Sequence, residues 1–314
     1  MRALVVGADG FAGRWLLRHL LESGDTVSAV VGPRYSEARP LLGVEPDRIH
    51  QLDVRDFAAL KSAVRAAEPD GVYYLAAVSQ AAGREELREA AGIALIGAVH
   101  ALMAGAEADS PPRLLYVSSA HVYGHAGSDG QPIDESAPVQ PASVYGAAKA
   151  AAEAALLQLA PASGVDVVIA RPFNHVGPGQ HAGFVIPTLA EQVRGIPRGT
   201  RGVVRVGVAH TVRDYTDVRD VVRAYRLLLT SGASSGIYNV ASGRGLSVRE
   251  VADALLATAG VSADLEVDDL RARPNDLTSL IGNASRLRSL GWRPERALRD
   301  TLRDVLDQVD TAGT

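Results

Sequence analysis

The 314-residue sequence contains no cysteine and has no strong excess of charge of either sign. The absence of cysteine excludes disulfide bonds and thiolate metal sites, and it fits the reducing environment of the cytoplasm. The formal net charge of -4 at pH 7 argues against a nucleic-acid surface, which would be basic. We therefore expect a cytoplasmic protein that binds no nucleic acid.

The sequence also lacks a long, strongly apolar run. The longest candidate, from Ala90 to Ala106, consists mostly of alanine and glycine and contains His100. A membrane span needs about 20 predominantly apolar residues, so this stretch predicts a closely packed helix and no membrane partner. The apolar start, Met1 to Val6, stops at Gly7, too early for a secretory signal. With 47% hydrophobic residues, the sequence predicts a soluble globular protein with a substantial core.

What the sequence does contain, near its start, is a glycine-rich turn between predicted elements. Gly7, Gly10 and Gly13 follow the apolar run Arg2–Val6, and a helix pattern and a second apolar run, Thr26–Val31, come next. This order is typical of dinucleotide-binding proteins. Gly7 permits the tight turn, Gly10 lets backbone amides approach a pyrophosphate, and Gly13 lets helix and strand pack closely. An ordinary strand-to-helix turn is the alternative.

The end of the second predicted strand indicates which cofactor is bound. An NAD site usually has an acidic residue there, which binds the ribose hydroxyls. This strand ends Val30-Val31-Gly32-Pro33-Arg34, with an arginine and no acid. NADP(H) is therefore favoured and NAD(H) stays possible, because Arg34 would attract a 2′-phosphate but could also be a solvated loop charge.

Strand and helix patterns continue to alternate, which predicts an α/β protein with a doubly wound parallel Rossmann sheet. Strands are expected at 49–53, 71–75, 114–118, 166–170 and 236–240, and helices at 56–68, 85–105, 147–160 and 247–259, with a further helix ending near 230.

After Ala170 the elements become shorter and richer in glycine and proline, which predicts a smaller C-terminal α/β substrate-binding lobe. We expect a dinucleotide-binding domain at 1–170 plus about 206–240, and a discontinuous substrate-binding domain at about 171–205 and 241–314. Because no flexible linker separates them, a ligand cleft is expected between the two lobes.

Ser119, Tyr145 and Lys149 are the candidate catalytic residues. Ser119 follows an apolar run that predicts a buried strand. Tyr145 and Lys149 are four residues apart, so they would share one face of an alanine-rich helix. An ammonium beside a phenol stabilises the phenolate, so that a tyrosine with an ordinary pKa of about 10 becomes a usable proton donor and acceptor. The serine could hold the substrate oxygen. The spacing alone is a weak pattern, and a surface helix is the alternative.

Other polar residues have weaker interpretations. Asp53 could accept a hydrogen bond from an adenine amino group or simply end its strand. The small residues Ala76 and Ala77 would leave room for the nicotinamide ribose. Although His121 and His125 are four apart, they lie at an exit from a strand, where that spacing does not share a face, so we expect no metal site.

Together, these motifs resemble the extended short-chain dehydrogenases that act on nucleotide sugars, over essentially the whole chain. The resemblance is strongest to the branch that holds GDP-mannose 4,6-dehydratase and GDP-4-keto-6-deoxy-D-mannose reductase. It rests on the glycine turn, the Ser119, Tyr145 and Lys149 set, Arg171-Pro172-Phe173-Asn174-His175-Val176-Gly177-Pro178-Gly179-Gln180, Arg213-Asp214-Tyr215-Thr216-Asp217-Val218-Arg219-Asp220, Arg273-Pro274-Asn275-Asp276, Ile281-Gly282-Asn283 and Gly291-Trp292-Arg293-Pro294.

The resemblance implies roles for individual residues. Tyr145 would be the acid/base, Lys149 would hold the nicotinamide ribose and lower the tyrosine pKa, and Ser119 would bind the sugar oxygen. The implied cofactor-binding residues are Gly7, Asp9, Gly10, Phe11, Gly13, Arg34, Asp53, Val54, Leu75, Ala76, Ala77, Tyr145, Lys149 and Arg171. The implied substrate-binding residues are His121, Asn174, Gln180, Val185, Arg213 and Arg273.

Two of these residues, Arg213 and Arg273, would pair with the sugar-nucleotide pyrophosphate, which suits a bidentate guanidinium. The alternatives are an ion pair of Arg213 with Asp214 or Asp217, and a surface position for Arg273. The two alanine-rich helices imply a homodimer built on a four-helix bundle, because small residues permit close approach.

The sequence departs from the family's 4,6-dehydratases directly after Ser119. Those enzymes have a carboxylate there that removes the C5 proton, whereas this chain has Ala120-His121. Elimination is therefore disfavoured, although His121 could act as a base. A reductase of a nucleotide-diphospho-4-keto-6-deoxyhexose, GDP-linked by preference, is favoured. An NAD-dependent 4-epimerase is the main alternative, and a dehydratase or a non-catalytic NAD(P)-binding regulator is disfavoured.

Overall fold

The computed structural model describes residues 1–36, 38, 40–78, 84–127, 130–268 and 277–307, and a seven-stranded parallel sheet forms its centre. The strand order is β10-β6-β5-β4-β1-β2-β3. Strand β1 is parallel to both of its neighbours, and the order in which strands are added to the sheet reverses between β1 and β4. This is the doubly wound sheet that the sequence predicts. The strands are β1 (Arg2–Val6), β2 (Thr26–Val31), β3 (Ile49–Gln51), β4 (Gly71–Tyr74), β5 (Arg113–Val117), β6 (Val167–Pro172) and β10 (Gly236–Val240).

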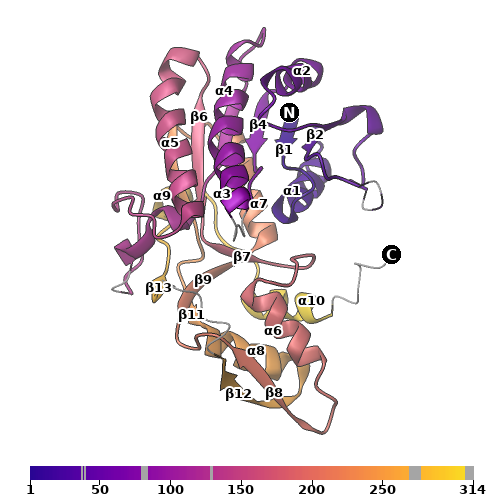
Figure 1. Cartoon of the computed structure of the whole chain (residues 1–314), viewed down its shortest axis with the longest axis vertical. Helices are drawn as coiled ribbons and strands as arrows, with labels where there is room; N and C mark the ends of the chain where they lie inside the picture. The colour runs from indigo at the N-terminus through magenta and orange to yellow at the C-terminus, as the bar shows by residue number, and fades with distance from the viewer. Residues whose placement is uncertain (37, 39, 79–83, 128–129, 269–276, 308–314) are drawn as a thin grey trace.

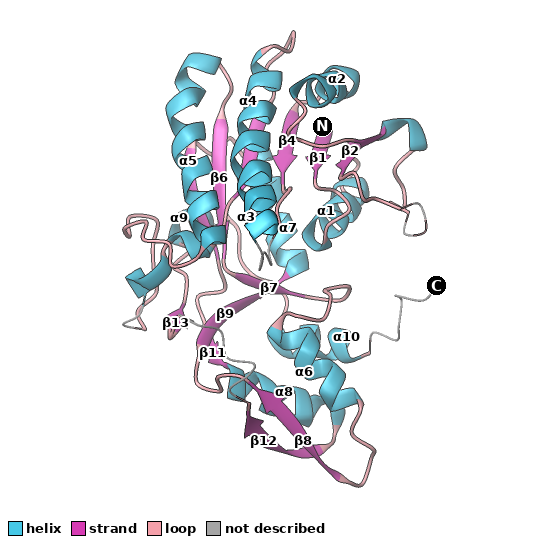
Figure 2. Ribbon diagram, viewed as in Figure 1, coloured by secondary structure: helices cyan, strands magenta, loops and turns pink. Residues whose placement is uncertain are grey.

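Helices cover both faces of this sheet because each strand is apolar on both sides. Along β1, Val5 belongs to one core cluster and the neighbouring Leu4 to the other, as the alternation of side chains in a strand requires. Helices α1 (Phe11–Glu22) and α7 (Val218–Thr230) pack together on the first face. On the second face, α2 (Phe57–Ala67) packs on α4 (Ala98–Ala106), which lies beside α5 (Val144–Ser163) (Figure 2).

The long helix predicted at 85–105 has three parts: α3 (Arg84–Ala91), a π-helical turn η2 (Gly92–Gly97) and α4. Two tyrosines from the sheet explain the wider turn. The hydroxyl of Tyr74 donates to the carbonyl oxygen of Ile93 at 2.6 Å, and that of Tyr116 donates to Ala94 at 3.2 Å. These side chains satisfy carbonyl groups that a regular α-helix would bond internally.

The stretch Leu87–Ala106 is long and apolar enough to cross a membrane by length and composition. In the fold it packs against α2 and α5, and Ala98, Ala101 and Leu102 belong to the core. One face of the helix is therefore part of the core.

A smaller lobe lies below the sheet in Figure 1. Its central strand, β9 (Val212–Asp217), pairs with β7 (Asn174–Val176), β11 (Gly245–Ser247) and β13 (Ser279–Leu280), and β8 (Arg201–Val206) pairs with β12 (Ser262–Val267). Helices α6 (Val185–Arg194), α8 (Val248–Ala259) and α10 (Leu298–Leu306) complete a separate core, and α9 (Ser285–Ser289) contacts β10.

The segment 206–240, expected to rejoin the first lobe, is divided between the two. Helix α7 and β10 lie with the large sheet, whereas β9 belongs to the smaller lobe. The chain therefore returns to the first lobe at α7, whose N-terminus is capped by the Asp217 carboxylate.

Candidate active site

The glycine turn between β1 and α1 has the geometry that a dinucleotide pyrophosphate needs. Gly7 has a φ of +85°, and a Cβ placed on it would lie 2.7 Å from the backbone nitrogen of Ala76. A Cβ on Gly13 would collide with the carbonyl oxygen of Gly7. The N-cap residue of α1, Gly10, supplies no side-chain cap, so the first amides of the helix can bind an anion. The turn therefore fits the cofactor that the sequence predicts.

At the end of β2, Arg34 lies on an exposed loop beside the expected position of the adenosine ribose. Its guanidinium pairs with Glu89 of α3. Asp53, after β3, binds Arg55 through both carboxylate oxygens, and this pairing lowers the pKa of Asp53. Asp53 thus has a protein partner where we expected an adenine contact or a strand end.

The start of α5 brings the candidate catalytic residues together. The Ser143 side chain caps the helix by accepting from the amide of Gly146 at 3.1 Å. A Cβ on Gly146 would lie 2.5 Å from the carbonyl oxygen of His121, so only glycine lets the helix approach the turn η3 (Ala120–Val122) this closely. Tyr145 is thereby placed beside the segment that carries Ser119.

Lys149 lies one helical turn after Tyr145 and is 1% exposed. Its ammonium donates to the carbonyl oxygen of Val117 at 2.7 Å and lies 4.8 Å from the centre of the Tyr116 ring and 6.0 Å from that of Tyr145. Burial lowers the pKa of Lys149 to about 7, and the Glu153 carboxylate partly opposes this shift.

The pKa of Tyr145 corrects the prediction of a phenol acidified by Lys149. Burial raises the pKa of Tyr145 to about 12, and a hydrogen bond with Ser119 offsets only part of the increase. Lys149 makes no large contribution to this pKa, because burial disfavours its ammonium form. The protein's own groups therefore keep Tyr145 protonated at neutral pH.

Ser119 and His121 border the same space as Tyr145. The Ser119 hydroxyl accepts from the amide of His121 at 3.2 Å. The imidazole of His121 meets the Tyr145 ring edge-on, with 6.0 Å between the ring centres and an interplanar angle of 76°. A sugar oxygen bound by Ser119 and Tyr145 would therefore lie close to His121.

The two lobes meet where β7 faces the glycine turn. The imidazole of His175 stacks on Phe11, the first residue of α1, with 5.8 Å between the ring centres. The side-chain atoms Asn174 Oδ1, His175 Nδ1 and Thr216 Oγ1 are buried without a hydrogen-bond partner among the described residues. Buried polar atoms are normally paired, so this unpaired group fits a ligand between the lobes.

His175 is a site residue that sequence reasoning missed. Its only signal is its place beside Asn174 in the 173–180 motif, and its stacking on Phe11 depends on tertiary structure. Gln180, predicted to bind substrate, donates to the carbonyl oxygen of His175 at 3.1 Å and thereby shapes this loop. Val185 is the first residue of α6, with its side chain exposed.

Arg171, predicted to contact the cofactor, has a protein partner on α5. Its guanidinium is buried and forms a pair with Glu153 of α5, with Nη2 2.5 Å from one carboxylate oxygen, and it also covers the ring of Tyr123. Arg171 therefore ties β6 to α5 beneath the site. Glu153 follows Lys149 by four residues, a spacing that would have identified it on the same helical face.

Arg213 lies on β9 and is largely buried, with Nη1 2.9 Å from the carbonyl oxygen of Val212. The two acids considered as its ion-pair partners have other roles. Asp214 accepts from Ser242, Gly243 and Gly282, and Asp217 pairs with Arg219. Arg273 lies outside the described residues.

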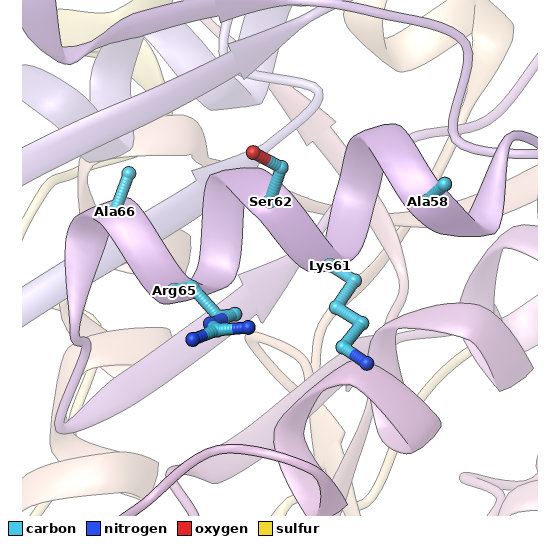
Figure 3. A pocket seen from close by; sticks show the side chains of 5 residues that line it. All are labelled: Ala58, Lys61, Ser62, Arg65 and Ala66. Carbon is cyan, nitrogen blue, oxygen red and sulfur yellow. The ribbon is translucent and has the colours of Figure 1, made fainter.

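Surface hollows elsewhere do not coincide with this site. The one in Figure 3, about 520 Å³, lies along the outer side of α2, and Lys61 at its edge pairs with Glu107. It contains no predicted site residue and is lined by Ala58, Lys61, Ser62, Arg65 and Ala66. Among the described residues, no group of three or more His, Asp or Glu could hold a metal ion.

A dinucleotide-binding turn and a Ser, Tyr and Lys set meet at the carboxyl edge of one parallel sheet, and the lobe beyond them supplies further polar groups. This combination defines an NAD(P)-dependent oxidoreductase with the fold of the short-chain dehydrogenases. The sequence profile described as GDP-mannose 4,6 dehydratase matches residues 4–305. The chain belongs to this family, as its motifs suggested.

Relatives of the chain have several activities on nucleotide sugars. It is 32% identical to GDP-6-deoxy-D-mannose reductase of Pseudomonas aeruginosa, over 99% of this chain and 97% of the relative. The structure of RMD from Pseudomonas aeruginosa complexed with NADPH has a TM-score of 0.81 at 30% identity, covering 98% of both chains. UDP-glucose 4-epimerase of Thermus thermophilus, in complex with NAD, also gives 0.81, at 27% identity and 98% coverage of both chains. The protein is therefore an NAD(P)-dependent nucleotide-sugar oxidoreductase.

Proposed function

We propose that this protein reduces the C4 keto group of a nucleotide-diphospho-4-keto-6-deoxyhexose with NADPH, and that GDP-4-keto-6-deoxy-D-mannose is its preferred substrate. The observation that carries the proposal is Ala120-His121 after Ser119, where a dehydratase would need a carboxylate for the C5 proton. The similarity to a GDP-6-deoxy-D-mannose reductase along nearly the whole chain supports the GDP-linked substrate.

The high pKa of Tyr145 fits a role as the proton donor in reduction. Reduction of a ketone creates an alkoxide at O4, which must receive a proton, and a phenol whose pKa is about 12 is protonated and ready to donate it. The reduced nicotinamide ring carries no charge, so it would leave Tyr145 protonated before hydride transfer.

Each protein group then has one role. When bound, NADPH would supply the hydride for C4. The Tyr145 hydroxyl would donate its proton to O4, and the Ser119 hydroxyl would hold O4 in position through a hydrogen bond. Lys149, held by the carbonyl of Val117, would place a titrating positive charge below the nicotinamide ribose. A hydrogen bond between Ser119 and Tyr145 places the two side chains beside each other.

An NAD-dependent 4-epimerase is the second candidate, because a UDP-glucose 4-epimerase has the same fold over 98% of this chain. The two functions differ in their use of reductant. A reductase consumes one NADPH for each sugar reduced, whereas an epimerase returns its hydride to the sugar and consumes none.

The test is incubation with GDP- and dTDP-linked 4-keto-6-deoxy sugars and NADPH, followed by nicotinamide absorbance and NMR of the products. We expect stoichiometric loss of NADPH and a 6-deoxyhexose product, fastest with the GDP-linked sugar. In a parallel incubation with UDP-glucose and NAD, conversion to the C4 epimer without net reduction of the cofactor would replace this proposal with the epimerase. Activity with neither sugar and no epimerisation would contradict both.

Arg34 is expected to set the preference for NADPH. Replacing it in Arg34→Ala should raise the Kd of NADPH about tenfold, the effect of losing a hydrogen bond to a charged group, and leave NADH within about twofold. The measurement is titration of the nicotinamide fluorescence. Arg18→Ala is a matched control, because Arg18 is also exposed and paired with a glutamate on α1. Equal weakening of NADPH and NADH would contradict a contact with the 2′-phosphate.

We also propose a homodimer that joins the alanine-rich helices of two chains. Within one chain, α4 and η2 lie beside α5, and this pair of helices leaves Ile96, Met103 and Leu157 exposed. The double variant Ile96→Glu/Leu157→Glu should be monomeric by light scattering, whereas Leu42→Glu, at an exposed leucine in a loop, should stay dimeric. A monomeric wild-type chain would contradict the proposal.

A further inference from the structure

The loop that carries Arg34 is held in place independently of the arginine side chain. Gln51, at the end of β3, donates from Nε2 to the carbonyl oxygens of Pro33 at 3.0 Å and Tyr35 at 3.2 Å. The amide of Tyr35 also donates to the carbonyl oxygen of Gly32 at 3.0 Å, which closes the turn. The backbone on both sides of Arg34 is therefore fixed, and its long side chain can turn without moving the loop.

In this structure the side chain turns toward a carboxylate. Nη2 of Arg34 lies 2.9 Å and 3.0 Å from the two carboxylate oxygens of Glu89. The Arg34 side chain is 86% exposed and that of Glu89 only 28%, so the carboxylate is the anchored member of the pair. The Arg34 side chain can leave Glu89 at a small cost in free energy, because an exposed ion pair contributes little to stability.

The neighbouring charges at this edge are balanced as well. Asp53 pairs with Arg55, whose side chain borders Gly92 on the helical segment that follows Glu89. In this described group of four, the arginines Arg34 and Arg55 face the carboxylates of Glu89 and Asp53, so the group has no net positive charge. A 2′-phosphate carries nearly two negative charges at neutral pH, so Glu89 both repels it and occupies the arginine that would bind it.

We propose that Glu89 is a specificity-determining residue that competes with the 2′-phosphate of NADPH for Arg34. Its carboxylate limits the preference for NADPH and keeps the site usable by NADH. The inference rests on the proposed cofactor site and deepens it, because it names what opposes Arg34 there.

The test is the Kd of NADPH and of NADH for the full-length protein without sugar, measured by nicotinamide fluorescence for Glu89→Gln. We expect about three- to fivefold tighter binding of NADPH, the size of a weak exposed pair, and an unchanged Kd for NADH.

In the Arg34→Ala background, the same substitution should lose most of this effect, because the two residues act as one unit. The effect should also shrink at high salt. Asp264→Asn, which breaks an exposed arginine pair between β12 and β8, is the matched control and should change neither Kd.

Weaker NADPH binding in Glu89→Gln would overturn the proposal, since it would mean that Glu89 holds Arg34 in its binding position. Equal tightening of NADPH and NADH, or an undiminished effect in the Arg34→Ala background, would also overturn it. These outcomes leave the proposed reductase intact because no sugar is present. If the wild-type protein bound neither dinucleotide, the proposed function and this inference would fail together.

Discussion

Tyr145→Phe is expected to lower kcat for NADPH-dependent reduction roughly 10²- to 10⁴-fold, the usual contribution of a positioned general acid. The substitution removes only the hydroxyl that would protonate O4, so the Kd of NADPH should stay within about twofold. Steady-state turnover with the GDP-linked 4-keto sugar gives kcat, and nicotinamide fluorescence gives the Kd. Loss of turnover with retained binding would place the proton donor at this side chain.

Tyr225→Phe is the matched control for this prediction. Tyr225 is a buried tyrosine on α7 whose hydroxyl has no hydrogen-bond partner among the described residues. Removing that hydroxyl should leave kcat unchanged. Near-normal turnover in Tyr145→Phe would remove Tyr145 from the mechanism, and an equal loss in both variants would point to a general effect of removing a buried hydroxyl.

The second large effect is on stability, in Glu153→Ala. Arg171 and Glu153 are 2% and 4% exposed, so removing the carboxylate leaves a buried guanidinium without a counter-charge. Breaking such a pair typically costs about 3–5 kcal/mol of the free energy of unfolding, which urea denaturation measures. The double variant Glu153→Leu/Arg171→Met should recover most of this loss, because replacing both members of a buried pair by apolar residues is often neutral.

An exposed pair provides the comparison. Asp264 pairs with Arg201 at the surface of the smaller lobe, and Asp264→Ala should cost no more than about 1 kcal/mol. A similarly small loss in Glu153→Ala would contradict the interpretation of Arg171 as the tie between β6 and α5.

The features that follow from local sequence were predicted well. Arg2–Val6, Thr26–Val31 and Gly236–Val240 are strands with the expected bounds, because short, mostly apolar runs between turn residues leave little choice of where a strand begins and ends. The glycine turn was predictable for a similar reason. Gly7 and Gly13 occupy positions where the backbone geometry excludes a side chain, and such positions are visible in sequence.

Features that depend on distant partners were not predictable. The π-helical turn η2 requires hydroxyl groups from Tyr74 and Tyr116, which belong to separate strands. Arg34 and Arg171 were both assigned to the cofactor as single charges, and the structure supplies each with a glutamate from another element. A lone arginine in a motif has no visible partner until the chain is folded.

The pKa of Tyr145 shows the same limit for the site itself. Helical spacing correctly brings Lys149 near Tyr145, yet spacing gives no measure of burial, which raises one pKa and lowers the other. The outcome changes the mechanistic argument. A phenol that stays protonated can donate its proton to the alkoxide that forms when a ketone is reduced.

The most direct test of this account follows the hydride itself. The protein is incubated with the GDP-linked 4-keto-6-deoxy sugar and NADPH that carries deuterium at the transferable position of the nicotinamide, and the product is analysed by NMR. We predict one deuterium at C4 of the 6-deoxyhexose and none at C3 or C5. A product whose C4 carries only protium, or a sugar altered without oxidation of the NADPH, would contradict it.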